Sequence, residues 1–184
     1  MRALLALLFA AMAGQAAAAV FNTPVVDKSS LTFVSRQMGV AVAGGFDKFT
    51  SQISFDPLKP ETGKAQIDVV LSSIDTGNGE ANDAVKGKSW FDVREYPVAT
   101  FVSGSLKALG GNRYQATGRL TIKGKSRDVV VPFTASPSGF TLVLEGNIPV
   151  LRSLYGIGEG AWSDPSVLAD EVQVHFHLTL DAAK

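Results

Sequence analysis

The chain of 184 residues contains no cysteine and only two histidines. It can therefore form no disulfide, and it offers neither a thiolate nucleophile nor a sulfur ligand for zinc. Neither His-Glu-x-x-His nor Gly-x-Ser-x-Gly occurs, so the usual metalloprotease and serine-hydrolase arrangements lack their parts. Basic and acidic residues balance at 17 each, which excludes the basic surface that nucleic acids or anionic lipids require.

The few groups that could support chemistry have simpler interpretations. His175 and His177 are spaced to share one face of a strand. This face lies opposite the apolar Val174 and Phe176 and is expected to be solvated, so no metal site is predicted. The glycine-rich run Gly156–Gly160 lacks the strand and helix that flank a phosphate loop. Asp92 and Glu95 are better explained as solvated charges than as an acid–base pair.

The first 19 residues have the pattern of a secretory signal peptide. Arg2 supplies the positive charge, Leu4–Met12 the apolar core, and Ala17–Ala19 the small residues that precede cleavage before Val20. No later apolar run is long enough to span a membrane. We expect one domain over residues 20–184, located in the periplasm.

Strand patterns fill most of the remaining chain. The clearest is at the end, where apolar and polar residues alternate: Val172, Val174, Phe176, Leu178 and Leu180 against Gln173, His175, His177 and Thr179. Pairs such as Lys123-Gly124 and Ser138-Gly139 are typical of hairpin turns. About eight strands with short turns and no βαβ spacing predict an all-β, antiparallel barrel or sandwich.

The strand rhythm breaks once, between Ile67–Leu71 and Val98–Val102. The excursion contains Ser73–Asn78, a polar, weakly amphipathic run to Lys88, and the aromatic-rich segment Trp90–Pro97. We interpret this excursion as a lid over one end of the β domain.

Phenylalanine is abundant, with 11 in the chain. Nine occupy core-type positions on or beside the expected strands: Phe33, Phe46, Phe49, Phe55, Phe91, Phe101, Phe133, Phe140 and Phe176. A small barrel can fill itself with such side chains or leave room for one elongated ligand. The pattern alone leaves both alternatives open.

Two arginines lie at positions in the strand pattern where an arginine is unusual. Arg36 lies near the end of an expected strand, and Arg152 interrupts the apolar run Ile148–Tyr155. Each either extends to the surface along its aliphatic stem or meets an anionic or carbonyl group at a pocket mouth. The sequence does not choose between the two.

Several motifs, in order along the chain, carry a family resemblance. They are Ser29–Phe33, Gly39-Val40, Gly45–Phe49, Phe55–Pro57, Ser73–Asn78, Phe91-Asp92-Val93 with Tyr96-Pro97 and Thr100-Phe101, Gly118–Gly124 and Asp170–Val172. Together they are similar to the YceI-like family of periplasmic polyisoprenoid-binding proteins. The resemblance implies an eight-stranded lipocalin-like barrel with a short helical excursion between two strands. Its interior would hold a ubiquinone-type or polyprenyl phosphate lipid, with the head group at the mouth.

The sequence departs from the family in places that bear on the head group. Lys28 and Gln37 stand where relatives often carry histidine. Arg152 matches the family's late arginine, but Leu154 replaces the aspartate that usually follows and Tyr155 the phenylalanine.

The resemblance and the strand pattern together predict a non-enzymatic lipid carrier with no cofactor besides the bound lipid or quinone. The expected ligand-binding residues are Phe33, Phe46, Phe49, Ile53, Ile67, Val69, Leu71, Trp90, Phe91, Tyr96, Phe101, Leu120, Phe133, Leu142, Arg152, Tyr155, Trp162 and Phe176. Trp90, Phe91 and Tyr96 would gate one end. Two alternatives stay open: an interaction protein with a filled barrel that docks on a membrane redox partner, and a hydrolase using Asp92 or Glu95. Family members are often dimers, so a homodimer is also considered.

Overall fold

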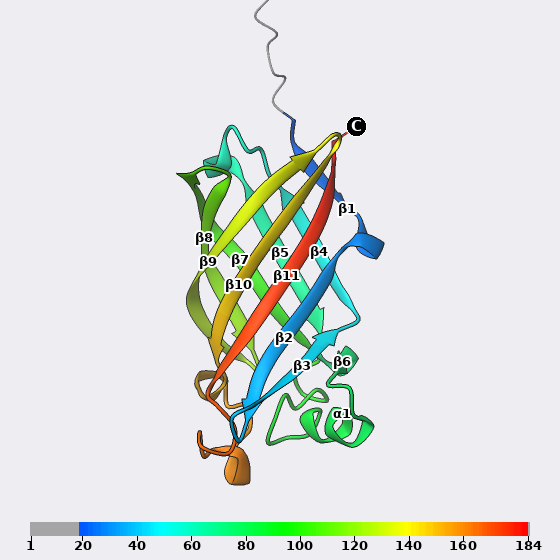
Figure 1. Ribbon diagram of the computed structural model, residues 1–184, viewed down its shortest axis with the longest axis vertical. Helices are drawn as coiled ribbons and strands as arrows, with labels where there is room; N and C mark the ends of the chain where they lie inside the picture. The colour runs from blue at the N-terminus through cyan, green and yellow to red at the C-terminus, as the bar shows by residue number, and fades with distance from the viewer. Residues whose placement is uncertain (1–18, 184) are drawn as a thin grey trace, which may run out of the picture.

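The computed structural model describes residues 19–183, which form an antiparallel β-barrel with a short α-helix at one end (Figure 1). The strands are β1 (Phe21–Pro24), β2 (Ser30–Gln37), β3 (Val40–Phe46), β4 (Phe49–Ser54), β5 (Lys64–Val70), β6 (Ile74–Asp75), β7 (Val98–Gly110), β8 (Arg113–Ile122), β9 (Lys125–Ser138), β10 (Thr141–Leu151) and β11 (Glu171–Ala182). The helical segments are α1 (Gly79–Val85) and the 3-10 turns η1 (Val26–Lys28), η2 (Pro60–Thr62), η3 (Leu71–Ser73), η4 (Arg152–Tyr155) and η5 (Gly160–Trp162). The expected signal peptide, apart from Ala19, lies outside the described residues.

The barrel closes through a bent strand made of β3 and β4, which only Asp47 and Lys48 separate. The first half, β3, pairs with β2, and the second half, β4, pairs with β5. The other neighbours follow in the order β5-β7-β8-β9-β10-β11-β2, all antiparallel. Counting β3 and β4 as one, eight strands surround the axis, which confirms the predicted barrel and excludes the sandwich.

The alternation of apolar and polar residues determines which side chains enter the barrel. On β11, Val172, Val174, Phe176 and Leu178 face the interior. His175 lies on the outer face and is exposed. The predicted solvent side of this strand is therefore confirmed, because a period of two sends neighbouring side chains to opposite faces.

One end of the barrel is filled by its own side chains, and we call it the closed end. The β7–β8 and β9–β10 hairpins and the C-terminal end of β11 lie there, at the top of Figure 1. Leu142 and Leu180 are completely buried in its core. Phe140 is a correction to the expected core: it follows Gly139 at the tip of the β9–β10 hairpin and is 88% exposed.

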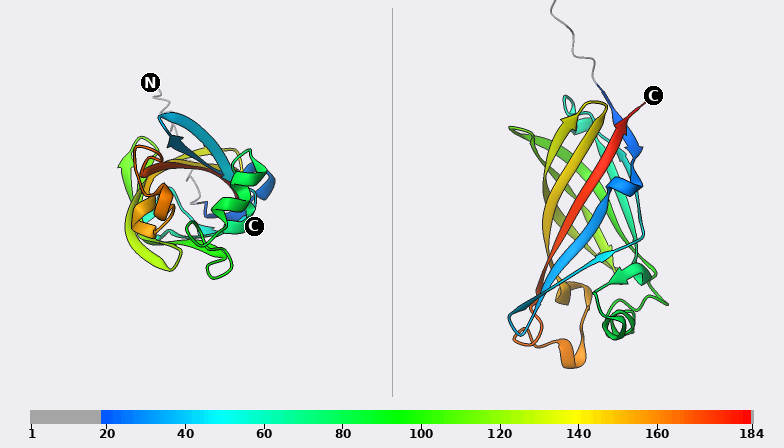
Figure 2. Two further views of the ribbon diagram at one scale, coloured as in Figure 1. Left: turned by 90° about the horizontal axis from the view of Figure 1, so that it is seen from below. Right: turned by 45° about the vertical axis from the view of Figure 1, so that its right-hand side comes forward.

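The opposite end carries the excursion and the turns η4 and η5 (Figures 1 and 2). The excursion forms η3, β6 and α1 between β5 and β7, which confirms the predicted helical interruption. Within residues 19–183, no helix is both long and apolar enough to cross a membrane.

Candidate functional site: an apolar cavity with a polar mouth

A cavity of about 710 Å³ occupies the barrel interior. This volume is within the range of about 300–1,000 Å³ that is typical of small-molecule sites. Strands on every side of the barrel contribute to its wall, and the contributing side chains are mostly phenylalanine, branched aliphatic residues and alanine. The barrel is thus hollow. Of the two alternatives that the sequence left open, a filled barrel and one with room for an elongated ligand, the structure has the second.

An aromatic cluster forms the floor of the cavity at the closed end. Phe55 packs edge-on against Tyr114 and Phe133, with ring centroids 5.1 and 5.8 Å away, and Tyr114 stacks on Phe133 at 5.5 Å. The Tyr114 hydroxyl donates to the carbonyl oxygen of Pro57 at 3.3 Å, so its polar end is satisfied. Only the rings of Phe55 and Phe133 face the cavity.

Three phenylalanines of the wall keep the interior open by lying over glycines. The pairs are Phe33 with Gly44, Phe101 with Gly118 and Phe176 with Gly146. In each pair a Cβ added to the glycine would lie within 3.0 Å of the ring. Because the far end of each ring occupies this space beside the neighbouring strand, the ring lies against the wall and leaves the axis free.

The mouth lies at the end that carries α1. Figure 2 shows α1 and the η4–η5 segment on opposite sides of the barrel axis when the barrel is seen from below. The polar side chains of the cavity lining gather here, on β2 and around the start of α1: Ser35, Gln37, Thr76, Asn78 and Glu80. The cavity therefore has a polar rim at one end only.

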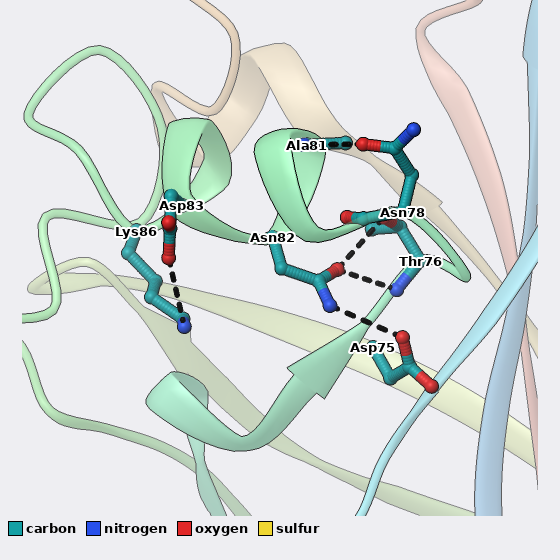
Figure 3. A network of polar contacts seen from close by, with 7 residues as sticks. All are labelled: Asp75, Thr76, Asn78, Ala81, Asn82, Asp83 and Lys86. Atoms are coloured by element: carbon teal, nitrogen blue, oxygen red, sulfur yellow. Dashed lines mark hydrogen bonds and ion pairs between the residues drawn. The ribbon is translucent and has the colours of Figure 1, made fainter.

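A hydrogen-bond network holds α1 at the rim (Figure 3). Asn78 caps the helix by accepting from the Ala81 N–H at 3.0 Å. The Asn82 side-chain oxygen accepts from the Thr76 N–H at 2.7 Å and from the Thr76 hydroxyl at 2.8 Å. The Asn82 amide nitrogen donates to Asp75 at 3.1 Å. Hydrogen bonds from Gly77 N–H and Asn82 lower the pKa of Asp75, because they stabilise its carboxylate.

The two sides of the mouth end also contact each other directly. The indole rings of Trp90, in the excursion, and Trp162, in η5, lie 5.6 Å apart. The N–H groups of Gly158 and Glu159 both donate to the carbonyl oxygen of Ser89 at 2.9 Å. The excursion and the η4–η5 segment therefore form one connected rim.

Arg152 lies in the cavity wall but is 4% exposed and is fully occupied by the chain itself. Its five N–H groups donate to five main-chain carbonyl oxygens at 2.7–3.1 Å: those of Ile157, Gly158, Trp162, Leu168 and Ala169. Burial lowers the pKa of the guanidinium, and Asp170 opposes this. Arg152 thus positions the segment 157–169 and has no N–H left for a ligand.

All but three of the predicted site residues line the cavity. Those that line it are Phe33, Phe46, Phe49, Ile53, Ile67, Val69, Leu71, Trp90, Phe91, Phe101, Leu120, Phe133, Arg152, Trp162 and Phe176. The exceptions are Leu142, buried in the closed end, Tyr155, the last residue of η4 and buried in the core, and Tyr96, whose ring covers Gly124.

The residues that sequence reasoning missed are mainly those of the rim. Ser35 and Gln37 continue the inward face of Phe33 on β2, so the period of two could have found them. Glu80 lies in the first turn of a seven-residue helix, where no apolar pattern indicates a face.

The other candidate groups stay outside the cavity. His177 bonds Glu145 at 2.7 Å on the outer surface. Asp92 and Glu95 do not line the cavity. Among residues 19–183, no three histidine, aspartate or glutamate side chains are grouped to hold a metal ion.

Comparison with known proteins places the barrel in a family. Residues 24–180 match the model of the YceI-like domain. The chain belongs to the YceI-like family. A UPF0312 protein of Pseudomonas syringae pv. tomato is 33% identical over 132 residues, which cover 69% of this chain and 67% of that protein. A UPF0312 protein of Shewanella oneidensis is 30% identical over 133 residues, covering 72% and 69%.

Solved structures with a similar fold are also known. The crystal structure of Burkholderia cenocepacia BcnA has a TM-score of 0.83 and 46% identity, and the match covers 85% of this chain and 98% of that one. A polyisoprenoid binding domain from Saccharophagus degradans has a TM-score of 0.65 at 18% identity, covering 90% and 98%. The second likeness is one of fold.

Proposed function

We propose that this protein binds and carries a long-chain polyisoprenoid lipid in the periplasm without transforming it. The observation that carries the proposal is the shape of the cavity: apolar along its length, closed by Phe55 and Phe133 at one end and polar at the other. Each buried CH₂ of an isoprenoid tail contributes about 0.8 kcal/mol of transfer free energy. Such a wall binds a tail without many directional contacts. The similarity to a domain described as polyisoprenoid binding supports the proposal.

Binding explains the lining better than catalysis does. The ionisable side chains of the cavity lining are Glu80 at the rim and the fully hydrogen-bonded Arg152. General acid–base or nucleophilic chemistry needs a positioned pair of groups near the reacting atoms, and the part of the chain described here offers no such pair in the lining. Ubiquinone-type lipids and polyprenyl phosphates are both long-chain polyisoprenoid lipids, so the proposed function includes both.

The proposal is tested by purifying the protein under mild conditions and identifying any bound lipid by native mass spectrometry and extraction. Phe101→Arg places a charge on the cavity wall and should abolish loading, because an unpaired cation is costly in an apolar interior. Val102→Arg is the matched control, since Val102 follows on β7 and is 44% exposed. A barrel that is reproducibly empty, and that takes up no isoprenoid on addition, would overturn the proposal.

The alternative of docking on a membrane redox partner has less support. It requires a filled barrel and an exposed aromatic surface in the excursion. The barrel is hollow, and Trp90, Phe91 and Tyr96 are all at least partly buried.

A further inference from the structure

The head group of a lipid in this cavity must lie at the mouth. The closed end is filled by the aromatic floor and by Leu142 and Leu180, which are completely buried. The polar groups of the lining lie at the opposite end, on β2 and around α1. The chemistry of this rim therefore determines which head groups the protein accepts.

Within residues 19–183, the cavity lining offers no available positive charge. Among the described residues, Arg152 is the only lysine or arginine in the cavity lining. All five of its N–H groups donate to main-chain carbonyl oxygens. Free guanidinium or ammonium groups are the strongest partners of a phosphate head group, and this lining supplies none.

The rim instead presents a carboxylate and neutral hydrogen-bonding groups. Glu80 is exposed at the start of α1, and its carboxylate makes no hydrogen bond or ion pair with residues 19–183. The side-chain amide of Gln37, half-buried on β2, is likewise without a partner in that range. An amide both donates and accepts hydrogen bonds, which suits a carbonyl or hydroxyl group, whereas the carboxylate repels an anion.

We propose that the lipid has an uncharged, hydrogen-bonding head group, such as a quinone or an alcohol, and that Glu80 excludes phosphate. This inference rests on the proposed function, because it selects among isoprenoid lipids. Gln37 is the rim residue that donates to the carbonyl or hydroxyl oxygen of the head group.

The test compares three lipids with the same tail: a polyprenol, its monophosphate and a quinone. Binding to the delipidated protein is measured by native mass spectrometry and by quenching of tryptophan fluorescence. The alcohol and the quinone should bind, and the phosphate roughly tenfold or more weakly, because like charges would face each other at the rim. Higher ionic strength should reduce this difference, since screening weakens the repulsion.

Variants of Glu80 and Gln37 test which residue is responsible for the preference for an uncharged head group over a phosphate. Glu80→Gln should improve phosphate binding while leaving the alcohol unchanged, and Glu80→Lys should reduce or reverse the preference. Asp83→Asn and Asp83→Lys are the matched controls, because Asp83 lies on the same helix, outside the lining, with its side chain 87% exposed. Gln37→Leu should weaken the alcohol and the quinone without improving the phosphate.

The outcomes separate this inference from the proposed function. Equal or tighter binding of the phosphate by the unmodified protein would overturn the uncharged head group while leaving the lipid-carrier proposal intact. Failure of all three lipids to bind would overturn the carrier proposal itself. A preference for the alcohol that Glu80→Gln and Glu80→Lys leave unchanged would overturn the role of Glu80.

Discussion

The two ends of the barrel are built by different kinds of interaction. At the closed end, Phe55, Tyr114 and Phe133 pack together with leucines that have no exposed surface. At the mouth, two smaller apolar clusters, around Tyr155 and around Val85, are supplemented by hydrogen bonds that Arg152 donates and Asn82 accepts and by one pair of indole rings. Apolar packing therefore dominates at the closed end, while the mouth adds a scaffold of hydrogen bonds to smaller apolar clusters. Changes at the closed end should act on stability alone, whereas changes at the mouth should also act, under the proposed function, on the entry and selection of the ligand.

The largest effect is expected at the closed end. Phe55→Ala removes a ring that is 1% exposed and contacts two other rings. We expect the free energy of unfolding, measured by urea denaturation, to fall by about 3–5 kcal/mol. The control is Phe140→Ala, at the same end but 88% exposed, which should change it by less than about 0.5 kcal/mol. Similar losses for both variants would contradict the separation between packed core and exposed hairpin tip.

A smaller but still substantial loss is expected for Arg152 at the mouth. Arg152→Met leaves five carbonyl oxygens without their donor, and we expect a loss of about 2–4 kcal/mol. Hydrogen exchange should accelerate across residues 157–169 and stay slow in β9 and β10. Arg36→Met is the control, because exposed Arg36 makes one long hydrogen bond, 3.4 Å, to Gly39. Uniform acceleration over the whole barrel would show that the mouth is no separate unit.

The same contrast explains what the sequence could predict. The closed end and the wall follow from local alternation: Val174 and Phe176 face inward because a strand has a period of two. Phe140 was misplaced because this rule says nothing about where a hairpin turn ends and the next strand begins. Leu142 was expected to bind the ligand but is buried in the core of the closed end, because periodicity cannot tell a side chain that lines a cavity from one that fills a core.

The mouth was harder to predict because its contacts join distant segments. The sequence left Arg152 with two alternatives, extension to the surface or contact with an anionic or carbonyl group at a pocket mouth. The structure shows the second, but the carbonyl groups belong to the chain itself and not to a ligand. The five acceptors of Arg152 are main-chain carbonyl oxygens. Because every residue carries such an oxygen, the sequence contains no signal from which these contacts could be predicted. Glu80 gave no signal either, since a single exposed glutamate is ordinary at the start of a helix.

The Trp90–Trp162 contact tests whether the mouth controls exchange of the ligand. Trp162→Ala removes an aromatic pair worth about 0.5–1.5 kcal/mol beyond its buried area. Stability should fall by at least that amount, because the partly buried area of Trp162 is lost as well. Lipid transfer to vesicles, followed by fluorescence, should become several-fold faster. Leu154→Ala, at the same end and 44% exposed, should leave the transfer rate unchanged. An unchanged rate in Trp162→Ala would mean that the ligand does not pass between these two segments.

The smallest expected effect concerns acid and is confined to α1. Hydrogen bonds from Gly77 and Asn82 lower the pKa of Asp75, so its folded value lies below the unfolded value of about 3.9. The carboxylate therefore stabilises the fold above that pH, and the contribution is lost as the pH falls through the folded pKa. Hydrogen exchange in α1 should rise over this acidic interval relative to the closed end. Asp75→Asn should remove that dependence and Asp83→Asn should retain it; the same acid response in both would assign the loosening of the mouth to other groups.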